Sequence, residues 1–150
     1  IKNYINLASP VLGSKIYKFS DQFFGNASRL IKDEDPVFKE GVYDKHGKWM
    51  DGWETRRKRD AGNDYVILKL GIPGKISEIQ IDTAFFNGNQ PEYASIDVCF
   101  SKNSKFKWNT ILTKKKITQL SSENFETILK KICLQPLQTK ILESIINFFI

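Results

Sequence analysis

The sequence predicts an all-β fold in which two antiparallel sheets pack face to face as a sandwich. Short apolar or alternating segments recur at even intervals through the middle of the chain, and turn residues such as glycine, proline and asparagine separate them. Phe, Tyr and Trp make up 13% of the residues, which suits a β-rich core better than a helical bundle. Strands at such spacing, with polar turns between them, are typical of antiparallel sandwiches.

The first two expected strands lie in the middle of the chain. Residues 64–70 form a nearly continuous β-branched and aliphatic run that ends at Gly71, and this pattern predicts a buried strand. Residues 76–83 alternate instead, with Ile79 and Ile81 on one face and polar side chains on the other. That alternation predicts a half-buried strand.

Two further strands are expected after a turn-rich loop. Residues 93–100 and residues 106–112 both alternate, with mainly apolar side chains on one face. The residues on that face are Ala94, Ile96, Val98 and Phe100 in the first segment, and Phe106, Trp108, Thr110 and Leu112 in the second. The lysine run at residues 114–116 predicts a solvated turn rather than a binding patch.

The last third of the chain gives conflicting signals. Apolar residues recur with helical spacing over residues 125–132 and again over residues 141–149, so periodicity alone predicts two short helices. Closure of a sandwich requires strands there instead. We expect a short helix over residues 125–132 and a strand over residues 140–148.

Length and composition limit the chain to one domain and exclude several functions. With 150 residues, 41% of them hydrophobic, the sequence suits a single compact domain over residues 1–150. The net charge of +6 favours solubility, and without a wider basic face it does not predict nucleic-acid binding. No segment has the length and apolar character of a membrane span or a secretory leader, so we expect neither.

The cysteine and histidine content bears on metal binding and on the cellular compartment. Cys99 and Cys133 are far apart, and neither has a second cysteine or a histidine at metal-ligand spacing. We therefore expect two reduced, buried thiols in a cytoplasmic protein. His46 is the only histidine, which excludes a site built from two or three imidazoles of one chain. We assign no metal ligand, and the sequence does not identify a cofactor.

Residues 47–59 (GKWMDGWETRRKR), called the Trp–Arg segment below, follow neither strand nor helix periodicity. In the structural interpretation, Trp49 or Trp53 anchors the core and residues 56–59 are an exposed basic turn. In the functional interpretation, guanidinium groups clamp a planar anion while a carboxylate moves protons. Nucleic-acid binding is a third interpretation, for which one basic run is weak support.

The Trp–Arg segment and its neighbours resemble the allantoicase family. Similar blocks stand at residues 19–24 (FSDQFF), 64–74 (DYVILKLGIPG) and 81–89 (IDTAFFNGN), in the family's order over about residues 7–100. The resemblance implies a jelly-roll β-sandwich of the galactose-binding-domain-like type. For full-length members it also implies hydrolysis of allantoate to ureidoglycolate and urea, a step of purine (allantoin) catabolism.

The sequence departs from the family pattern in two ways. Allantoicases usually carry two tandem copies of this domain, whereas this chain has one, so we expect a homo-oligomer or a second tandem domain. The family also tends to close each copy with a strand, a Pro-Asp-Gly-Gly turn and a further strand, which this sequence lacks. An open sheet edge would follow unless the protein continues.

The implied reaction cuts a carbon–nitrogen bond at the carbon that carries allantoate's carboxylate and two ureido groups. The site would need a cation for the carboxylate, an acid for the leaving urea nitrogen, a base for water and amide partners for the ureido edges. By residue type, Arg56 or Arg57 clamps the carboxylate. The other expected site residues are Glu54 or Asp51 for proton transfer, His46 as a further acid or base, Trp53 as a substrate contact, and Asp82 with Asn89 as ureido partners.

The alternative is a non-catalytic galactose-binding-like module that recognises a small polar ligand or a protein partner. A purely interaction role for a truncated relative is a third option. The retained Trp–Arg segment favours a ureide site, because a partly buried polar cluster with no chemistry to serve would cost stability.

Overall fold

The computed structural model describes residues 5–74, 76, 79–101, 106–116, 126–129 and 143–149. Nearly all of its regular structure is β. The main strands are β1 (Lys15–Phe19), β4 (Tyr65–Lys69), β5 (Ile79–Asp82), β6 (Tyr93–Ser101), β7 (Asn109–Lys116), β8 (Glu126–Leu129) and β9 (Glu143–Phe149). The shorter elements are the hairpin strands β2 (Tyr43–Asp44) and β3 (Gly47–Lys48), with the 3₁₀ helices η1 (Pro10–Leu12) and η2 (Ala27–Ile31).

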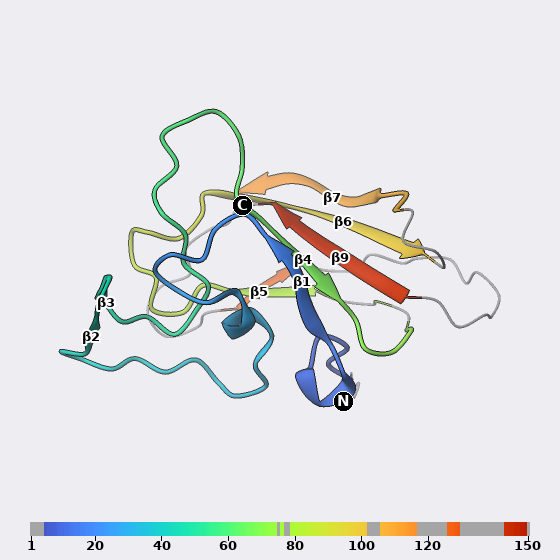
Figure 1. Cartoon of the computed structure of the whole chain (residues 1–150). Coiled ribbons are helices and arrows are strands. Elements are labelled where there is room, and N and C mark those ends of the chain that lie inside the picture. The colour runs from blue at the N-terminus through green and yellow to red at the C-terminus, as the bar shows by residue number, and fades with distance from the viewer. Residues whose placement is uncertain are drawn as a thin grey trace.

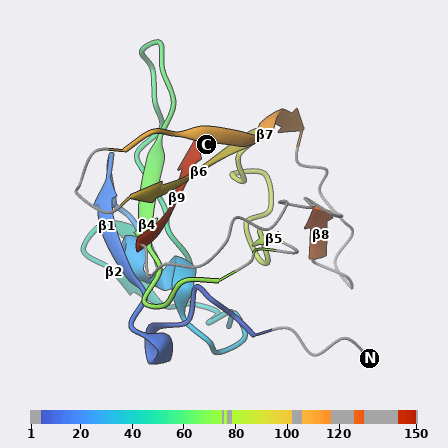
Figure 2. The ribbon, with the colours of Figure 1, turned by 90° about the vertical axis from the view of Figure 1, so that its right-hand side faces the viewer.

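The main strands form two antiparallel sheets. Five of them lie in the order β1-β4-β9-β6-β7, and every neighbouring pair in that sheet is antiparallel. Strands β5 and β8 pair separately, also antiparallel. They lie to one side of the larger sheet, so that the two sheets form two layers (Figures 1 and 2). The predicted all-β sandwich is therefore confirmed.

The core lies between the two sheets. Leu68 on β4 and Ile96 on β6 are buried in one cluster, against which Ile79 and Ile81 of β5 pack. Ile31 from η2 is a buried member of the same cluster. Burial alternates along β4 and β5, as expected for strands with one face on a core. The predicted inward face of residues 76–83 is thus confirmed for Ile79 and Ile81, whereas residues 64–70 alternate rather than being buried throughout.

Strands β6 and β7 differ from the prediction in detail. On β6, Ala94 and Ile96 face inward as expected, but Phe100 is 49% exposed and Cys99 is 3% exposed. The register irregularities opposite β7, on either side of Ile96, do not explain this difference, because the extra residues lie on β7 while β6 pairs with β9 in continuous register from Ser95 to Ser101.

The lysine run was also misassigned. Strand β7 begins at Asn109, later than expected, and continues through Lys116, so residues 114–116 lie in a strand and not in a turn. Lys114 Nζ lies 4.6 Å from the centre of the Tyr93 ring on the neighbouring strand. The lysines therefore lie in a strand that pairs with β6, and Lys114 and Lys116 remain exposed to solvent.

The helix expected over residues 125–132 is wrong where the structure describes it. Glu126–Leu129 is strand β8, which pairs with β5 from Ile79↔Leu129 to Asp82↔Glu126. Cross-strand pairing overrides helical spacing in so short a segment, where periodicity alone separates helix from strand poorly. The strand expected over residues 140–148 is confirmed from residue 143 onward, since β9 lies between β4 and β6. The remaining residues of both predictions lie outside the described part.

Replacing Ile96 tests the two-layer core. Ile96 is 0% exposed, so Ile96→Ala should lower the free energy of unfolding by about 2–5 kcal/mol, the usual cost of emptying a packed site. Val11→Ala is the control because Val11 is 87% exposed, and its effect should stay within about 0.5 kcal/mol. Urea unfolding of both variants measures the difference, and equal losses would contradict a core at Ile96.

Candidate functional site

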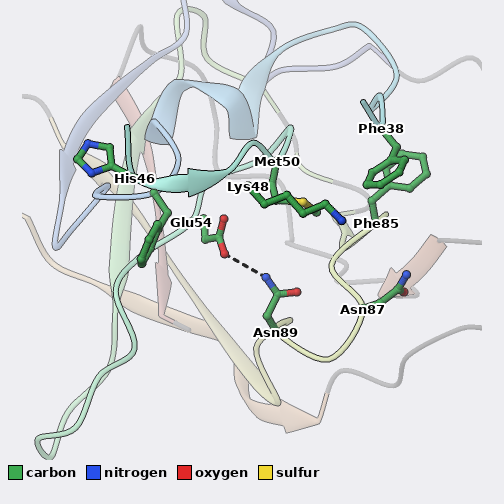
Figure 3. Close-up of a pocket in the computed structure, with 9 residues that line it drawn as sticks. Phe38, His46, Lys48, Met50, Glu54, Phe85, Asn87 and Asn89 are labelled. Carbon is green, nitrogen blue, oxygen red and sulfur yellow. Dashed lines mark hydrogen bonds between the residues drawn. The ribbon is translucent and has the colours of Figure 1, made fainter. Parts of the chain in front are cut away.

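A pocket of about 510 Å³ lies at one end of the sandwich. The segments that enclose it follow β1 and β5 and precede β4 and β6, and Figure 1 shows these loops gathered at the same end of the sheets. The pocket is lined by Phe24, Phe38, His46, Lys48, Met50, Glu54, Phe85, Asn87 and Asn89 (Figure 3).

The hairpin β2–β3 supplies two of the polar lining residues. Tyr43 pairs with Lys48 and Asp44 pairs with Gly47, so His46 lies in the turn and Lys48 follows it. The NH of His46 donates to Asp44 Oδ1 at 2.8 Å, which closes the turn. Gly47 has φ 135°, a value that L side chains rarely adopt, so glycine at this position lets the chain return with Lys48 on the pocket side.

The Trp–Arg segment continues from the hairpin along the pocket wall. Arg29 Nη1 donates to the carbonyl oxygen of Met50 at 2.7 Å. The guanidinium of Arg29 and the ammonium of Lys39 lie 5.3 and 4.9 Å from the Trp49 ring centre, so two cations contact this indole. These contacts hold the buried Met50 side chain against the pocket.

Trp53 and Glu54 diverge from one short stretch of backbone. Trp53 is buried, and its Nε1 donates to the carbonyl oxygen of Asp21 at 2.7 Å, which confirms the core-anchor interpretation. Glu54 forms an antiparallel bridge with Gly25, with N···O distances of 3.2 and 2.9 Å. A Cβ on Gly25 would lie 2.3 Å from the carbonyl oxygen of Gly52, so only glycine permits this approach. The bridge directs the Glu54 side chain into the pocket.

The Glu54 carboxyl group is the acidic centre of the pocket. Burial raises its pKa, and the negative charge of Asp44 adds to the rise, against the opposing effects of Asn89 and Arg29. Asn89 Nδ2 donates to Glu54 Oε1 at 3.0 Å, and Figure 3 shows the two side chains pointing toward one another. A carboxyl group in this environment keeps its proton to a higher pH than an exposed glutamate does.

An aromatic pair forms the opposite wall. The rings of Phe38 and Phe85 stack with their centres 5.7 Å apart, and Lys48 Nζ lies 4.7 Å from the centre of the Phe38 ring. Phe85 has φ 67°, which is rare for a bulky residue and strained. Asp82 Oδ1 accepts the NH of Ala84 at 2.7 Å and shapes the turn in which Phe85 lies. Such strain at a pocket wall is typical of functional sites.

Arg56 does not line the pocket. Its backbone NH and its Nη2 donate to Asp21 at 2.7 and 3.1 Å, and its side chain is 66% exposed. Burial would raise the pKa of Asp21, but the hydrogen bonds and positive charge of Arg56 outweigh it and hold that pKa below its usual value. Arg57 is exposed and lies outside the lining as well.

Asp51 also lies outside the lining and is held by an ion pair. Its carboxylate bonds to Lys32 Nζ and accepts the NH of Val37 at 2.9 Å, and its side chain is 7% exposed. Burial would raise the pKa of Asp51, but the hydrogen bonds from Lys32 and Val37 and the charges of Lys32 and Arg29 lower it overall. A carboxylate with this environment suits a structural role.

The structure therefore brings together only part of the expected site. Of the residues singled out from the sequence, the pocket gathers Glu54, His46 and Asn89, while Asp51, Trp53, Arg56, Arg57 and Asp82 lie outside its lining. Sequence reasoning missed Lys48, Asn87 and the aromatic wall. Lys48 and Asn87 stand inside two of the blocks that carry the resemblance, so a search of those blocks for every polar residue would have found them.

Two further findings concern metals and membranes. Within the described ranges, no group of three or more His, Cys, Asp or Glu side chains is arranged to hold a metal ion. No helix in the same part of the chain has the length and apolar character needed to cross a bilayer.

Asp51→Asn tests the structural role of the ion pair with Lys32. The variant should lower the free energy of unfolding by about 1–3 kcal/mol near neutral pH, because a buried, charge-assisted contact is lost. The folded-state pKa is lowered, so wild type keeps this stabilisation above the unfolded value of 3.8 and loses it as the pH falls through the folded value.

The difference in unfolding free energy between wild type and Asp51→Asn should therefore become smaller at acidic pH, as measured by urea unfolding over a pH series. Glu40→Gln, at an exposed position in the same loop, is the control and should change stability by less than about 0.5 kcal/mol. A loss that is independent of pH would contradict the ion pair.

Comparisons with known proteins agree on one family. The family described as Allantoicase repeat matches residues 5–143. A protein named probable allantoicase from Acinetobacter baumannii (strain SDF) is 52% identical over 110 residues, which is 71% of this chain and 33% of that protein. Another protein of that name, from Pseudomonas aeruginosa (strain LESB58), is 52% identical over 99 residues, which is 66% of this chain and 30% of that protein. The chain thus spans about a third of the length of these relatives.

Solved structures agree with the fold. A structure of allantoicase superposes with a TM-score of 0.72 at 27% identity, covering 97% of this chain and 44% of that one. The crystal structure of allantoicase from Saccharomyces cerevisiae gives a TM-score of 0.69 at 25% identity, covering 97% of this chain and 43% of that one. These matches confirm the galactose-binding-like jelly roll. With the family match over residues 5–143, they show that the chain belongs to the allantoicase family.

Proposed function

We propose that the pocket is an allantoicase site, in which allantoate is hydrolysed to ureidoglycolate and urea. The observation that carries the proposal is the half-buried Glu54, whose pKa is raised and whose carboxyl group faces Asn89 within a pocket that also holds Lys48 and His46. This reaction needs one acid, one base, one cation and two amides.

Lys48 is the proposed partner of the allantoate carboxylate. It is the lysine among the lining residues, and no arginine stands among them. Its ammonium group lies against the Phe38 ring, and the flexible four-carbon stem can carry it toward a bound anion. This assignment replaces Arg56, whose fork is engaged by Asp21.

Glu54 and His46 are the proposed proton carriers. His46 accepts a proton from water as the water oxygen bonds to the central carbon of allantoate. The bond from that carbon to one ureido nitrogen breaks, its electron pair stays on nitrogen, and Glu54 delivers a proton there. Urea leaves and a hydroxyl group remains on the carbon. A carboxyl group with a raised pKa suits the acid, and imidazole is the usual base near neutral pH.

The amides and the aromatic wall are proposed to hold the ureido groups. Asn89 donates to Glu54 through Nδ2, which leaves its Oδ1 to accept from a ureido NH. Asn87 lies on the same loop and also lines the pocket. The stacked rings of Phe38 and Phe85 offer a flat surface to a planar ureido group.

Assembly and location belong to the same proposal. Because the chain spans about a third of its relatives, we infer that the active protein contains a second copy of the domain, in tandem or as a homo-oligomer. Cys99 is a buried free thiol, which suits a reducing cytoplasmic compartment.

Urea release tests the proposed reaction. The purified full chain should release urea from allantoate and leave allantoin untouched, and Glu54→Gln should slow turnover by about 10²–10⁴-fold, because the amide cannot deliver a proton. The acid must be protonated to act, so wild-type turnover should fall as the pH rises through the raised pKa of Glu54. The residual activity of Glu54→Gln should lack that fall.

A folded wild-type protein that contains the second copy of the domain and releases no urea, with and without added divalent metal, would contradict the enzymatic proposal. That outcome would favour the non-catalytic ligand-binding module instead.

The second test concerns the cation. Lys48→Met, combined with Glu54→Gln to prevent turnover, should weaken allantoate binding by about 1.5–3 kcal/mol in calorimetric titration, the scale of a hydrogen bond to a charged group. Lys45→Met is the matched control, because Lys45 stands on the same hairpin, is exposed and does not line the pocket. A loss in Arg57→Met with none in Lys48→Met would return the carboxylate clamp to the arginine run.

A further inference from the structure

We propose that Arg56 is a positioning residue that holds His46 at the pocket through the ring of Phe23. This inference rests on the proposed function only in giving His46 a role in proton transfer. The contact chain itself runs from Asp21 through Arg56 and Phe23 to His46, and three of these four residues lie outside the pocket lining.

The first link fixes the guanidinium. Asp21 Oδ2 accepts the backbone NH of Arg56 at 2.7 Å and its Nε at 3.4 Å, while Oδ1 accepts Nη2 at 3.1 Å. Asp21 is itself tied to the core, because its carbonyl oxygen accepts the indole NH of Trp53. A long side chain that is two-thirds exposed is thereby held in one place.

The second link places the guanidinium on an aromatic ring. Arg56 Cζ lies 5.1 Å from the centre of the Phe23 ring, within the range of a cation–π contact. Phe23 is 41% exposed, so packing alone restrains it weakly. The ring of Phe24, which lines the pocket, lies 5.0 Å from the Phe23 ring, centre to centre, and nearly perpendicular to it. Arg56 therefore covers a ring that solvent would otherwise reach.

The third link reaches the pocket. The imidazole of His46 lies 4.1 Å from the Phe23 ring, centre to centre. His46 stands in the turn of a hairpin whose strands have two residues each, which gives the backbone little rigidity of its own. The Phe23 ring therefore meets the imidazole and ties it to the loop after β1.

Arginine suits this position better than lysine for a physical reason. A planar guanidinium can bond to a carboxylate along its edge while its face lies on an aromatic ring, and an ammonium group cannot do both. The same geometry leaves Arg56 unable to clamp substrate without releasing Asp21.

The single histidine allows a direct test by NMR. In the full chain, the carbon-bound imidazole protons of His46 give one set of signals, whose positions report on the nearby Phe23 ring. Phe23→Leu should move these signals. Arg56→Gln should move them in the same direction, and Arg56→Lys should move them less. Arg59→Gln, an exposed arginine of the same run, is the control and should leave them in place.

Unmoved His46 signals in a folded Arg56→Gln chain would overturn the proposal. If that variant does not fold, Arg56→Lys carries the test, and signals identical to wild type would overturn the proposal equally.

Kinetics separate positioning from substrate binding. A displaced His46 should lower kcat on allantoate by about 10–100-fold with KM nearly unchanged. A higher KM with unchanged kcat would make Arg56 a substrate ligand and overturn the positioning role. Because the NMR measurement needs no turnover, moved signals in a chain without urea release support the contact chain and reject the proposed function. Unmoved signals in an active enzyme reject the contact chain and support the proposed function.

Discussion

The candidate site depends on one close backbone approach, the bridge between Gly25 and Glu54. Two backbone hydrogen bonds join these residues, and the absence of a side chain on Gly25 is what lets the strands meet. Neighbouring side chains in an extended segment point to opposite sides. The bridge therefore buries Trp53 in the core and turns Glu54 into the pocket. Any residue larger than glycine at position 25 would clash with the backbone of Gly52 and Glu54 and would break this bridge.

Charge pairing explains why Glu54 differs from the other carboxylates near it. Asp21 and Asp51 are each engaged by a cation and by backbone NH groups, and the pKa of each is lowered. Glu54 accepts from a neutral amide, and burial raises its pKa. These three carboxyl groups thus divide into two ionised supports and one that keeps its proton to a higher pH. The environment decides between these roles, since the residue types are nearly the same.

The sequence was sufficient for the parts of the fold that local patterns determine. Alternation over residues 76–83 correctly gave the inward face of β5, and the core anchor expected at Trp49 or Trp53 is confirmed at Trp53, which was also expected to contact substrate but lies outside the pocket lining. Prediction from the sequence failed where pairing with a distant segment decides the secondary structure. Residues 126–129 have helical spacing but complete the smaller sheet as β8. The family resemblance marked segments that line the pocket, but residue type alone could not show that Lys48 lines it while Arg56 and Arg57 do not, because all three are basic residues of the same segment.

The contact between Arg56 and Asp21 shows what the family's separate blocks have in common. Asp21 lies 35 residues before Arg56, and Asn89 lies 35 residues after Glu54. Each contact joins the Trp–Arg segment to another block, residues 19–24 in one case and residues 81–89 in the other. Residues 19–24, 47–59 and 81–89 therefore contact one another beside one pocket, and each of these three blocks contributes to its lining. A polar residue inside a block is explained by its partner in another block, and an arginine whose partner is an aspartate of the scaffold has little freedom left for a ligand.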